Sequence, residues 1–367
     1  MDISSGLVGL NKMDLDTPAL LVDLDTLERN IARVSAECRA HGVSWRPHSK
    51  AHKSPAIARL QLAAGAIGVT CAKLGEAEVM AAAGIRNILI ANQIVGSAKI
   101  ARLMSLLGKA EPIVLVDNKK NIDALNEAAA HERKQLSVAI EVNVGMNRAG
   151  VEPGEPTLAL ANYIATRSAL RFVGLAAWES HATTLADQNE KGRTVTAALG
   201  RLTATADECR KAGHRIDVVS CGGTGTFPYC IRHPGITEVQ VGGGIFGDMR
   251  YQTQYHVDFE LALTLLTTVT SRSTPTRIVV DAGKKAMSSD GAMPKPLRLP
   301  QIATMKLSAE HTKIELSAPS ETPDVGDKLE FVVGYSDTTV HLHELIIGVR
   351  SGRVETVYPV LGRGKLR

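Results

Sequence analysis

The feature of this sequence that most restricts its fold is a regular alternation of short apolar runs with longer helix-like segments. Eight runs rich in β-branched residues are expected to be strands: residues 43–45, 66–71, 87–91, 112–116, 137–143, 171–177, 216–220 and 238–241. Segments rich in Ala, Leu, Glu and Lys with helical spacing lie between them, among them residues 74–83, 98–107, 119–130 and 191–212. Eight such strands predict an α/β fold, a (β/α)8 TIM barrel. The alternative is a doubly wound open sheet, but eight units in a row favour the closed barrel.

The C-terminal part of the chain has a different pattern. Short strand-like runs at residues 259–269, 277–281, 313–316, 328–333, 345–349 and 354–358 are broken by Gly, Pro, Ser and Asp. No long helical pattern lies between them, which predicts a separate β domain, and an early run at residues 19–23 is expected to pair into it. We therefore expect a barrel over residues 25–255 and a β domain made from residues 1–24 and 256–367.

Composition and charge exclude several classes of protein. Charged residues make up 22% of the chain and the net charge is +4, with Lys and Arg interleaved with Asp and Glu, so we expect no nucleic-acid surface. No apolar run reaches transmembrane length and no signal-peptide pattern stands at the start, so we expect no membrane partner. The five cysteines have no CxxC spacing, which predicts a reduced, cytoplasmic setting.

A cluster of basic residues follows the first expected barrel strand. In the run RPHSKAHK, residues 46–53, Lys50 stands between two histidines and two further cations. Neighbouring positive charge disfavours the protonated form of an amine, and a neutral amine is what Schiff-base chemistry with a carbonyl needs. The alternative interpretation is a solvated basic turn. Lys50 is therefore the candidate catalytic lysine.

Glycine-rich loops follow the seventh and eighth expected strands. They read GGTGT at residues 222–226 and GGG at residues 242–244. The active site of a TIM barrel forms at the carboxyl ends of its strands, and the loops after strands seven and eight commonly bind phosphate through backbone N–H groups. Either loop alone is better explained as a tight turn. Together they predict a phosphate site whose candidate residues are Gly223, Thr224, Gly225, Thr226, Gly242 and Gly243.

A phosphate site opposite a reactive lysine predicts a phosphorylated aldehyde cofactor, for which pyridoxal 5'-phosphate is the obvious candidate. Arg148, after the fifth strand, is expected to hydrogen-bond this cofactor, and the alternative is that it caps a strand. Trp178 and His181, after the sixth strand, are expected to flank its ring, although a single tryptophan is more often a core residue.

These residues resemble those of the fold-type III pyridoxal-phosphate enzymes, and among them the D-threonine aldolase and D-serine dehydratase branch related to alanine racemase. The similarity covers nearly the whole chain. It rests on DTPA at 16–19, RPHSKAHK at 46–53, GMNR at 145–148, GGTGT at 222–226, DAG at 281–283 with KA at 285–286, YSDTTV at 335–340 and LHE at 342–344. The resemblance implies that Lys50 carries the cofactor and that residues from Gln240 to Gly243 help to hold its phosphate, with Trp178 where the family usually has a tyrosine. It also implies a homodimer whose active site the β domain completes.

One departure from the family pattern concerns a metal. This branch usually binds a divalent cation (Mn, Mg or Zn) through a His-x-Asp or His-x-Cys pair in the C-terminal domain. The corresponding residues here are Tyr335-Ser336-Asp337, so the resemblance leaves Asp337 as the metal ligand. One carboxylate supplies few of the ligands that such a cation takes, and using His341 or His343 would need a register shift. Alternatively, Tyr335 is a proton-transfer group, the part that a C-terminal tyrosine plays in alanine racemases.

The activity that the resemblance implies is that of a lyase acting on a small-molecule substrate, a D-configured β-hydroxy-α-amino acid, which it cleaves to glycine and an aldehyde. The base that removes the β-hydroxyl proton would be a metal-bound water, His181 or Tyr335. The alternatives are a D-serine or D-hydroxyamino-acid dehydratase, an amino-acid racemase with Lys50 and Tyr335 as opposed bases, and a non-catalytic pyridoxal-phosphate carrier. The β domain argues against the carrier, because carriers resemble the barrel alone.

Overall fold

The computed structural model describes residues 6–299 and 301–367, which form two compact units. The first, here called the β unit, holds the chain up to Ile31 together with Ala51–Ala56 and Gly243–Arg363. The second, the barrel unit, holds Ala32–Lys50, Ile57–Gly242 and Gly364–Arg367. The predicted functional domains, residues 25–255 and residues 1–24 with 256–367, stay a prediction.

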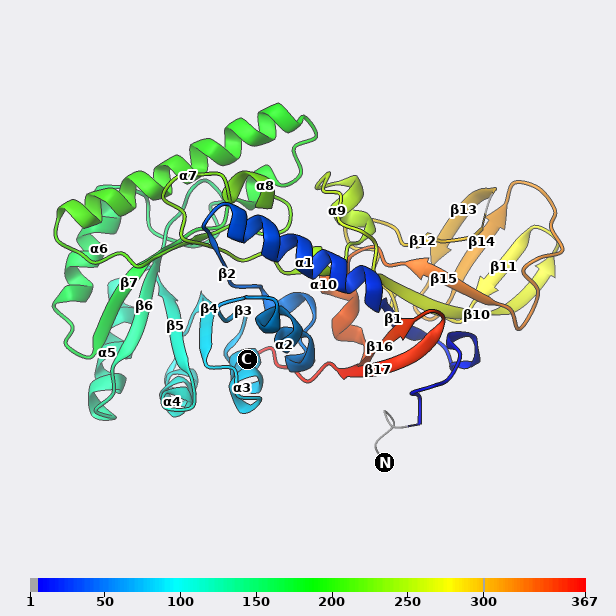
Figure 1. Ribbon diagram of the computed structural model, residues 1–367, viewed down its shortest axis with the longest axis horizontal. Helices are drawn as coiled ribbons and strands as arrows, with labels where there is room; N and C mark the ends of the chain where they lie inside the picture. Colours follow the sequence, from blue (N-terminus) through cyan, green and yellow to red (C-terminus); the bar gives the residue numbers. More distant parts are fainter. Residues whose placement is uncertain (1–5, 300) are drawn as a thin grey trace. The chain divides into compact units, whose positions relative to one another are not determined.

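Eight parallel strands form the barrel unit (Figure 1). They are β2 (Ser44–Trp45), β3 (Val69–Cys71), β4 (Asn87–Gln93), β5 (Glu111–Val116), β6 (Leu136–Glu141), β7 (Leu170–Ala176), β8 (Val218–Cys221) and β9 (Glu238–Val239). Their order is β2-β9-β8-β7-β6-β5-β4-β3. The two ends of this order meet, because the Ile67 and Thr70 amides donate to the carbonyls of Trp45 and Pro47, both at 2.8 Å. The predicted α/β barrel is thus confirmed.

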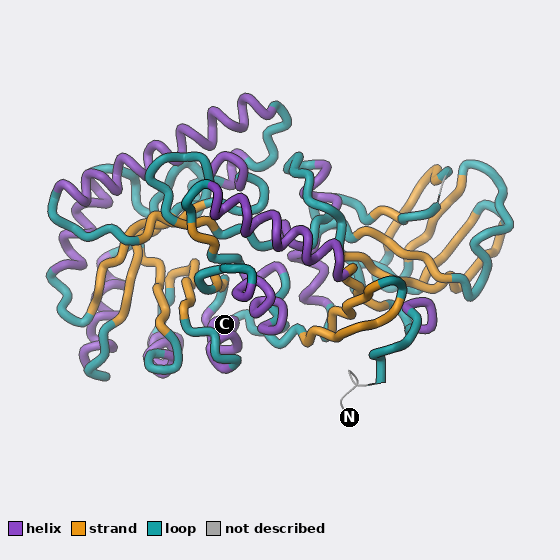
Figure 2. The backbone as a smooth tube through the Cα atoms, viewed as in Figure 1, coloured by secondary structure: helices purple, strands orange, loops and turns teal. Residues whose placement is uncertain are grey.

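Helices follow these strands in the order that the sequence pattern predicts, and Figure 2 shows them along the outside of the strands. They are α2 (Pro55–Ala63), α3 (Leu74–Ala82), α4 (Ser97–Leu106), α5 (Lys119–His131), α6 (Glu155–Ala165), α7 (Gln188–Lys211) and α8 (Phe227–Cys230), while α1 (Leu24–Ala40) precedes the first strand. Side-chain caps fix two of the starts: Asn118 accepts from the Asn121 amide and Asp187 from the Glu190 amide. The strands are buried on both faces, as expected for parallel strands that read as continuous apolar runs.

The β unit contains a nine-stranded sheet. Its strands are β1 (Ala19–Asp23), β10 (Leu263–Thr274), β11 (Arg277–Val280), β12 (Lys295–Pro296), β13 (Ile302–Leu307), β14 (Thr312–Leu316), β15 (Lys328–Val332), β16 (Leu345–Arg350) and β17 (Arg353–Pro359). The early strand β1 lies antiparallel to β10 and parallel to β16, as expected from its sequence. Two short helices, α9 (Met249–Thr253) and α10 (Ser336–Thr339), interrupt the strands. Within the described ranges, no helix has both the length and the apolar character to cross a membrane.

Candidate functional site

The residues predicted for the site in the barrel unit follow the carboxyl ends of its strands. Lys50 comes after β2, Arg148 after β6, Trp178 and His181 after β7, residues 222–226 after β8, and Gln240 after β9. The carboxyl ends of parallel barrel strands meet at one edge. The alternation of strands and helices therefore gathers these side chains at that edge, although they are far apart in sequence.

Lys50 lies half-buried in a 3-10 turn, Ser49–Ala51, a short stretch after strand β2. Its amide donates to Nδ1 of His48 at 3.4 Å, which requires that this ring nitrogen carry no proton. The Ser49 hydroxyl, fully buried, lies 3.4 Å from Sγ of Cys71 on β3. These contacts hold the turn that carries Lys50 against strand β3.

The neighbours of Lys50 are less positively charged than the sequence suggests. Arg46, only 3% exposed, makes a two-pronged ion pair with Glu238 on β9, with distances of 2.9 Å from Nε to Oε1 and 2.8 Å from Nη2 to Oε2. A further guanidinium hydrogen bond goes to Asn87. His52 is buried in the β unit, and its Nδ1 accepts from the Ser54 amide at 3.1 Å. Arg46 therefore contributes no uncompensated charge, and its role is to join β2 to β9.

The GGTGT loop is shaped by close packing against Trp178. A β-carbon on Gly223 would lie 2.3 Å from Cη2 of that half-buried indole, and Gly222 has a φ of +77°, where glycine is favoured. The amides of Thr226 and Phe227 both donate to the Gly223 carbonyl, at 3.1 and 3.0 Å, so the loop turns tightly into α8. The structure thus brings Trp178 and the predicted phosphate loop together.

Glu179 is a residue of this site that the sequence analysis missed. Its side chain is fully buried; Oε1 accepts from the Thr226 hydroxyl, and Oε2 accepts from the Gly222 amide at 3.4 Å. The thiol of Cys230 lies 3.4 Å from Oε1. Thr226 therefore directs its hydroxyl to Glu179. No spacing in the sequence marks Glu179, because the groups that it binds come from 43 to 51 residues further along the chain.

Glu179, Cys221 and Cys230 are close enough to be considered as metal ligands, because their ligand atoms lie within 4.8 Å of one another. Among the described residues, no other set of three or more His, Cys, Asp or Glu side chains lies this close together. Burial raises the pKa of the Glu179 carboxyl and of both thiols. Metal ligation requires deprotonated thiols, so these shifts favour a neutral, hydrogen-bonded cluster that supports the loop.

His181 lies over the loop that follows β6. A β-carbon on Gly145 would be 3.1 Å from its imidazole, and Gly145 has a φ of +127°, so this close approach needs a glycine. Asn143 Oδ1 accepts from the amides of Gly145 and Asn147, at 3.2 and 3.0 Å, and shapes the loop. Burial, and then the positive charge of Arg201, lower the pKa of His181, so the neutral imidazole is favoured and can accept a proton.

Arg148 and Gln240 contact other polar groups of the barrel edge. Nη2 of the largely exposed Arg148 lies 3.8 Å from Oε1 of Glu141, and Oε2 of that carboxylate accepts from Gln93 at 2.5 Å. Burial raises the pKa of Glu141. The Gln240 amide donates to Oγ of Ser220 at 2.9 Å. After Gln240, a β-carbon on Gly242 would lie 2.4 Å from the backbone oxygen of His48, which explains the glycine there.

The remaining predicted residues belong to the β unit. A β-carbon on Gly243 would lie 2.1 Å from the hydroxyl oxygen of Tyr251, so this glycine too is required by packing. The Tyr335 hydroxyl donates to Oδ2 of Asp337 at 3.0 Å, and the Arg250 guanidinium lies 4.5 Å from the centre of the Tyr335 ring. Burial, and then the charge of Asp337, raise the pKa of Tyr335 well above its ordinary value, so this phenol stays protonated.

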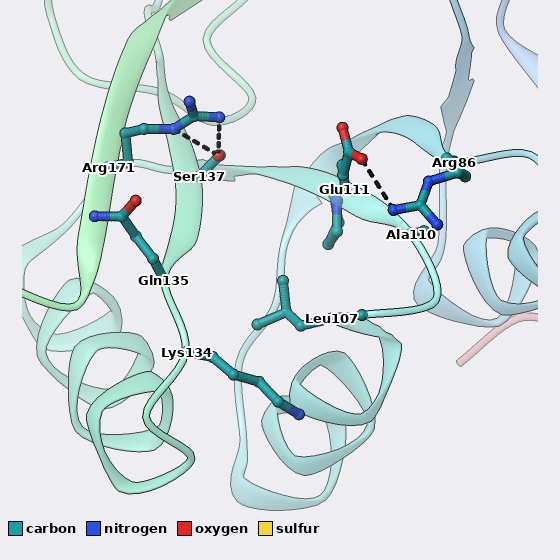
Figure 3. Close-up of a pocket in the computed structure, with 10 residues that line it drawn as sticks. Arg86, Leu107, Ala110, Glu111, Lys134, Gln135, Ser137 and Arg171 are labelled. Carbon is teal, nitrogen blue, oxygen red and sulfur yellow. Dashed lines mark hydrogen bonds and ion pairs between the residues drawn. The ribbon is translucent and has the colours of Figure 1, made fainter.

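A cavity of about 390 Å³ lies at the other edge of the barrel, at the amino ends of β5, β6 and β7 (Figure 3). Its lining includes Arg86, which pairs with Glu111 at 3.0 Å, and Arg171, which donates to Ser137 at 2.9 Å. These side chains bind one another and none of them is a nucleophile or base of the predicted site. The chemistry of a TIM barrel lies at the carboxyl edge, so this cavity is not the candidate active site.

Comparisons with known proteins agree with this geometry. The family model of the alanine racemase N-terminal domain matches residues 22–250, and that of a putative serine dehydratase domain matches residues 262–349. The chain is 35% identical over 370 residues to 3-hydroxy-D-aspartate aldolase from Paracoccus denitrificans, covering 98% of this chain and 95% of that protein.

Two solved structures extend the likeness to the whole fold. D-threonine aldolase from Filomicrobium marinum superposes with a TM-score of 0.94 at 36% identity, over 98% of this chain and 99% of that one. A mutant of D-threo-3-hydroxyaspartate dehydratase in the metal-free form has a TM-score of 0.87 at 26% identity, over 95% and 99% of the two chains. On these similarities, which cover nearly the whole chain, this chain belongs to the fold-type III pyridoxal-phosphate enzymes, in the family of D-threonine aldolase and D-serine dehydratase.

Proposed function

We propose that the protein is a pyridoxal-phosphate-dependent lyase that cleaves the Cα–Cβ bond of D-configured β-hydroxy-α-amino acids, giving glycine and an aldehyde. The observation that carries this proposal is the similarity to an aldolase over nearly the full length of both chains, through both units. Relatives that are dehydratases are less similar: a D-threo-3-hydroxyaspartate dehydratase is 31% identical over 76% of this chain, and the structure described above is 26% identical. An aldolase is therefore the favoured member of the family.

The residues at the carboxyl edge of the barrel fit the cofactor. Lys50 offers the amine for covalent attachment, and the loops at residues 222–226 and 240–243 would hold the phosphate through backbone N–H groups and the Thr224 hydroxyl. Trp178 packs on the first of these loops and would lie beside the cofactor ring. When bound, pyridoxal phosphate supplies an electron sink for the pair of electrons that the broken Cα–Cβ bond leaves on the α-carbon.

His181 is the proposed acceptor of the β-hydroxyl proton. Removal of that proton lets the oxygen form the carbonyl of the aldehyde as the Cα–Cβ bond breaks, so the enzyme needs a neutral base at this point. The lowered pKa of His181 keeps its imidazole neutral near pH 7. Tyr335 remains a second candidate for proton transfer, and because its phenol stays protonated it would act as a proton donor rather than as a base.

Setting and assembly are further parts of this proposal. All five cysteines are buried and free, which supports a reducing, cytoplasmic setting. The homodimer is proposed on the resemblance to the family, and light scattering coupled to gel filtration tests it. A mass of one chain would refute it.

A proton NMR time course with D-threonine and the holoenzyme tests the reaction. We expect glycine and acetaldehyde in equal amounts, and none from Lys50→Ala protein or from L-threonine. The formation of 2-oxobutanoate would show a dehydratase instead, and interconversion of D- and L-alanine would show a racemase. Bound cofactor without turnover of any D-amino acid would support the carrier.

A further inference from the structure

The segment that begins α10 contains the residues that correspond to the metal-binding pair of the family. It follows β15 and reads Tyr335-Ser336-Asp337, with Tyr335 at the N-cap position of the helix. A phenol replaces an imidazole here, and the two differ in chemistry: imidazole binds divalent cations when neutral, whereas a phenol must first lose its proton. The contacts of this segment decide whether it can hold a cation.

Tyr335 acts as a hydrogen-bond donor and not as a ligand. Its hydroxyl donates to Oδ2 of Asp337 at 3.0 Å, so one oxygen of the carboxylate that a cation would need is already engaged. A cation bound through both oxygens of Asp337 would have to displace this hydrogen bond.

A fixed positive charge lies beside the pair. The guanidinium carbon of Arg250 is 4.5 Å from the centre of the Tyr335 ring and 5.4 Å from that of Tyr255. Among the described residues, this guanidinium forms an ion pair with Asp290, which is 3.5 Å away and mostly exposed, so Asp290 compensates the charge weakly. A dication placed at Asp337 would be repelled by this guanidinium.

Other polar side chains around the segment make hydrogen bonds within the protein. Both carboxylate oxygens of Asp248 accept hydrogen bonds, Oδ1 from the Tyr251 amide and Oδ2 from the amide and hydroxyl of Ser336. Nε2 of His343 lies 2.6 Å from the Ala286 carbonyl and donates to it. Asp337 belongs to no group of three or more closely spaced ligands in the described ranges. The donor set does not fit a divalent cation.

We propose that the Tyr335–Asp337 pair, with Arg250 beside it, stands in place of the divalent metal of the family and keeps a cation from binding there. The lyase proposed above would then work without added metal. This last consequence rests on the proposed function, whereas the exclusion of the cation does not.

Manganese titration followed by electron paramagnetic resonance tests the exclusion on the holoenzyme, because bound Mn²⁺ loses the sharp signal of the free ion. We expect the wild type to leave added Mn²⁺ free and Tyr335→His to bind one ion per chain. The binding gained by Tyr335→His should disappear when Asp337→Asn is added. Tyr335→Phe is the matched control: it removes the hydrogen bond without supplying a ligand and should leave Mn²⁺ free.

Binding of one Mn²⁺ by the wild type that Asp337→Asn abolishes would overturn the proposal. Failure of Tyr335→His to gain an ion, with an unchanged circular dichroism spectrum, would equally overturn the assignment of the exclusion to Tyr335. In a separate assay, D-threonine cleavage should be the same before and after exhaustive treatment with chelator. If no cleavage occurs under either condition, the proposed function fails while the manganese result still stands.

Discussion

Replacing Gly223 by alanine tests how the GGTGT loop is built. The new β-carbon would lie 2.3 Å from Cη2 and 2.7 Å from Cζ3 of Trp178, so either the indole or the loop must move. Overpacking of this kind costs about 1–3 kcal/mol. Because the loop is the proposed phosphate site, we expect pyridoxal phosphate to bind roughly 10- to 100-fold more weakly, the equivalent of about 1.4–2.8 kcal/mol. Titration of the cofactor's visible absorbance measures this change.

Two companion variants separate the clash from a general effect of adding a methyl group. Gly200 lies inside α7 with nothing within 4 Å of its β-carbon position, so Gly200→Ala should stabilise the protein by about 0.5–1 kcal/mol against urea and leave cofactor affinity unchanged. Phenylalanine lacks the indole atoms Cη2 and Cζ3, so Trp178→Phe should relieve the clash that Gly223→Ala creates. In a double-mutant cycle on cofactor affinity, the coupling energy between the two substitutions should be at least about 0.5 kcal/mol. Unchanged affinity in Gly223→Ala, or a cycle without coupling, would refute the reasoning.

Three further results are expected. Arg46→Leu should leave Glu238 buried without its counter-ion and lower the free energy of unfolding by about 3–5 kcal/mol in urea denaturation. The double variant Arg46→Leu with Glu238→Leu should recover most of this stability. An equal loss of stability in the single and the double variant would contradict this prediction. In the pH profile of kcat/KM, the fall at low pH should be centred below the ordinary histidine pKa of about 6.5. In Arg201→Gln this fall should move to higher pH, because His181 loses a neighbouring positive charge. A fall that does not move in Arg201→Gln would count against His181 as the base. Gly242→Ala would place a β-carbon 2.4 Å from the backbone oxygen of His48. This variant should lower the melting temperature more than Gly223→Ala does, because a backbone atom cannot move aside as a side chain can. A smaller decrease in melting temperature than in Gly223→Ala would contradict this prediction.

The barrel was predictable because its strands read as continuous apolar runs, which is what burial on both faces demands. The edge strand β13 (Ile302–Leu307) was not predicted, since most of its side chains are exposed or half-buried and it lacks a clear alternation. Its pairing with β14 comes from backbone hydrogen bonds that any sequence can make.

The position of the candidate site could be predicted better than the residues that support it. The sequence pattern places Lys50 and the glycine loops after barrel strands, and the structure has them there; their roles stay a prediction. Glu179 could not be predicted, since its role depends on Thr226 and Cys230, which only the fold brings to it. The same holds for Arg46: a sequence gives its charge, while the partner that cancels this charge lies 192 residues away.

That separation has a consequence for how the chain folds as it is synthesised. Arg46 leaves the ribosome early and Glu238 late, so for most of synthesis the guanidinium has no counter-ion and the barrel has two open strand edges. Burying the unpaired charge would cost several kcal/mol, which disfavours premature closure of the nascent sheet around the first seven strands. We therefore expect closure to become favourable only once β9 has been synthesised and its carboxylate can pair with Arg46.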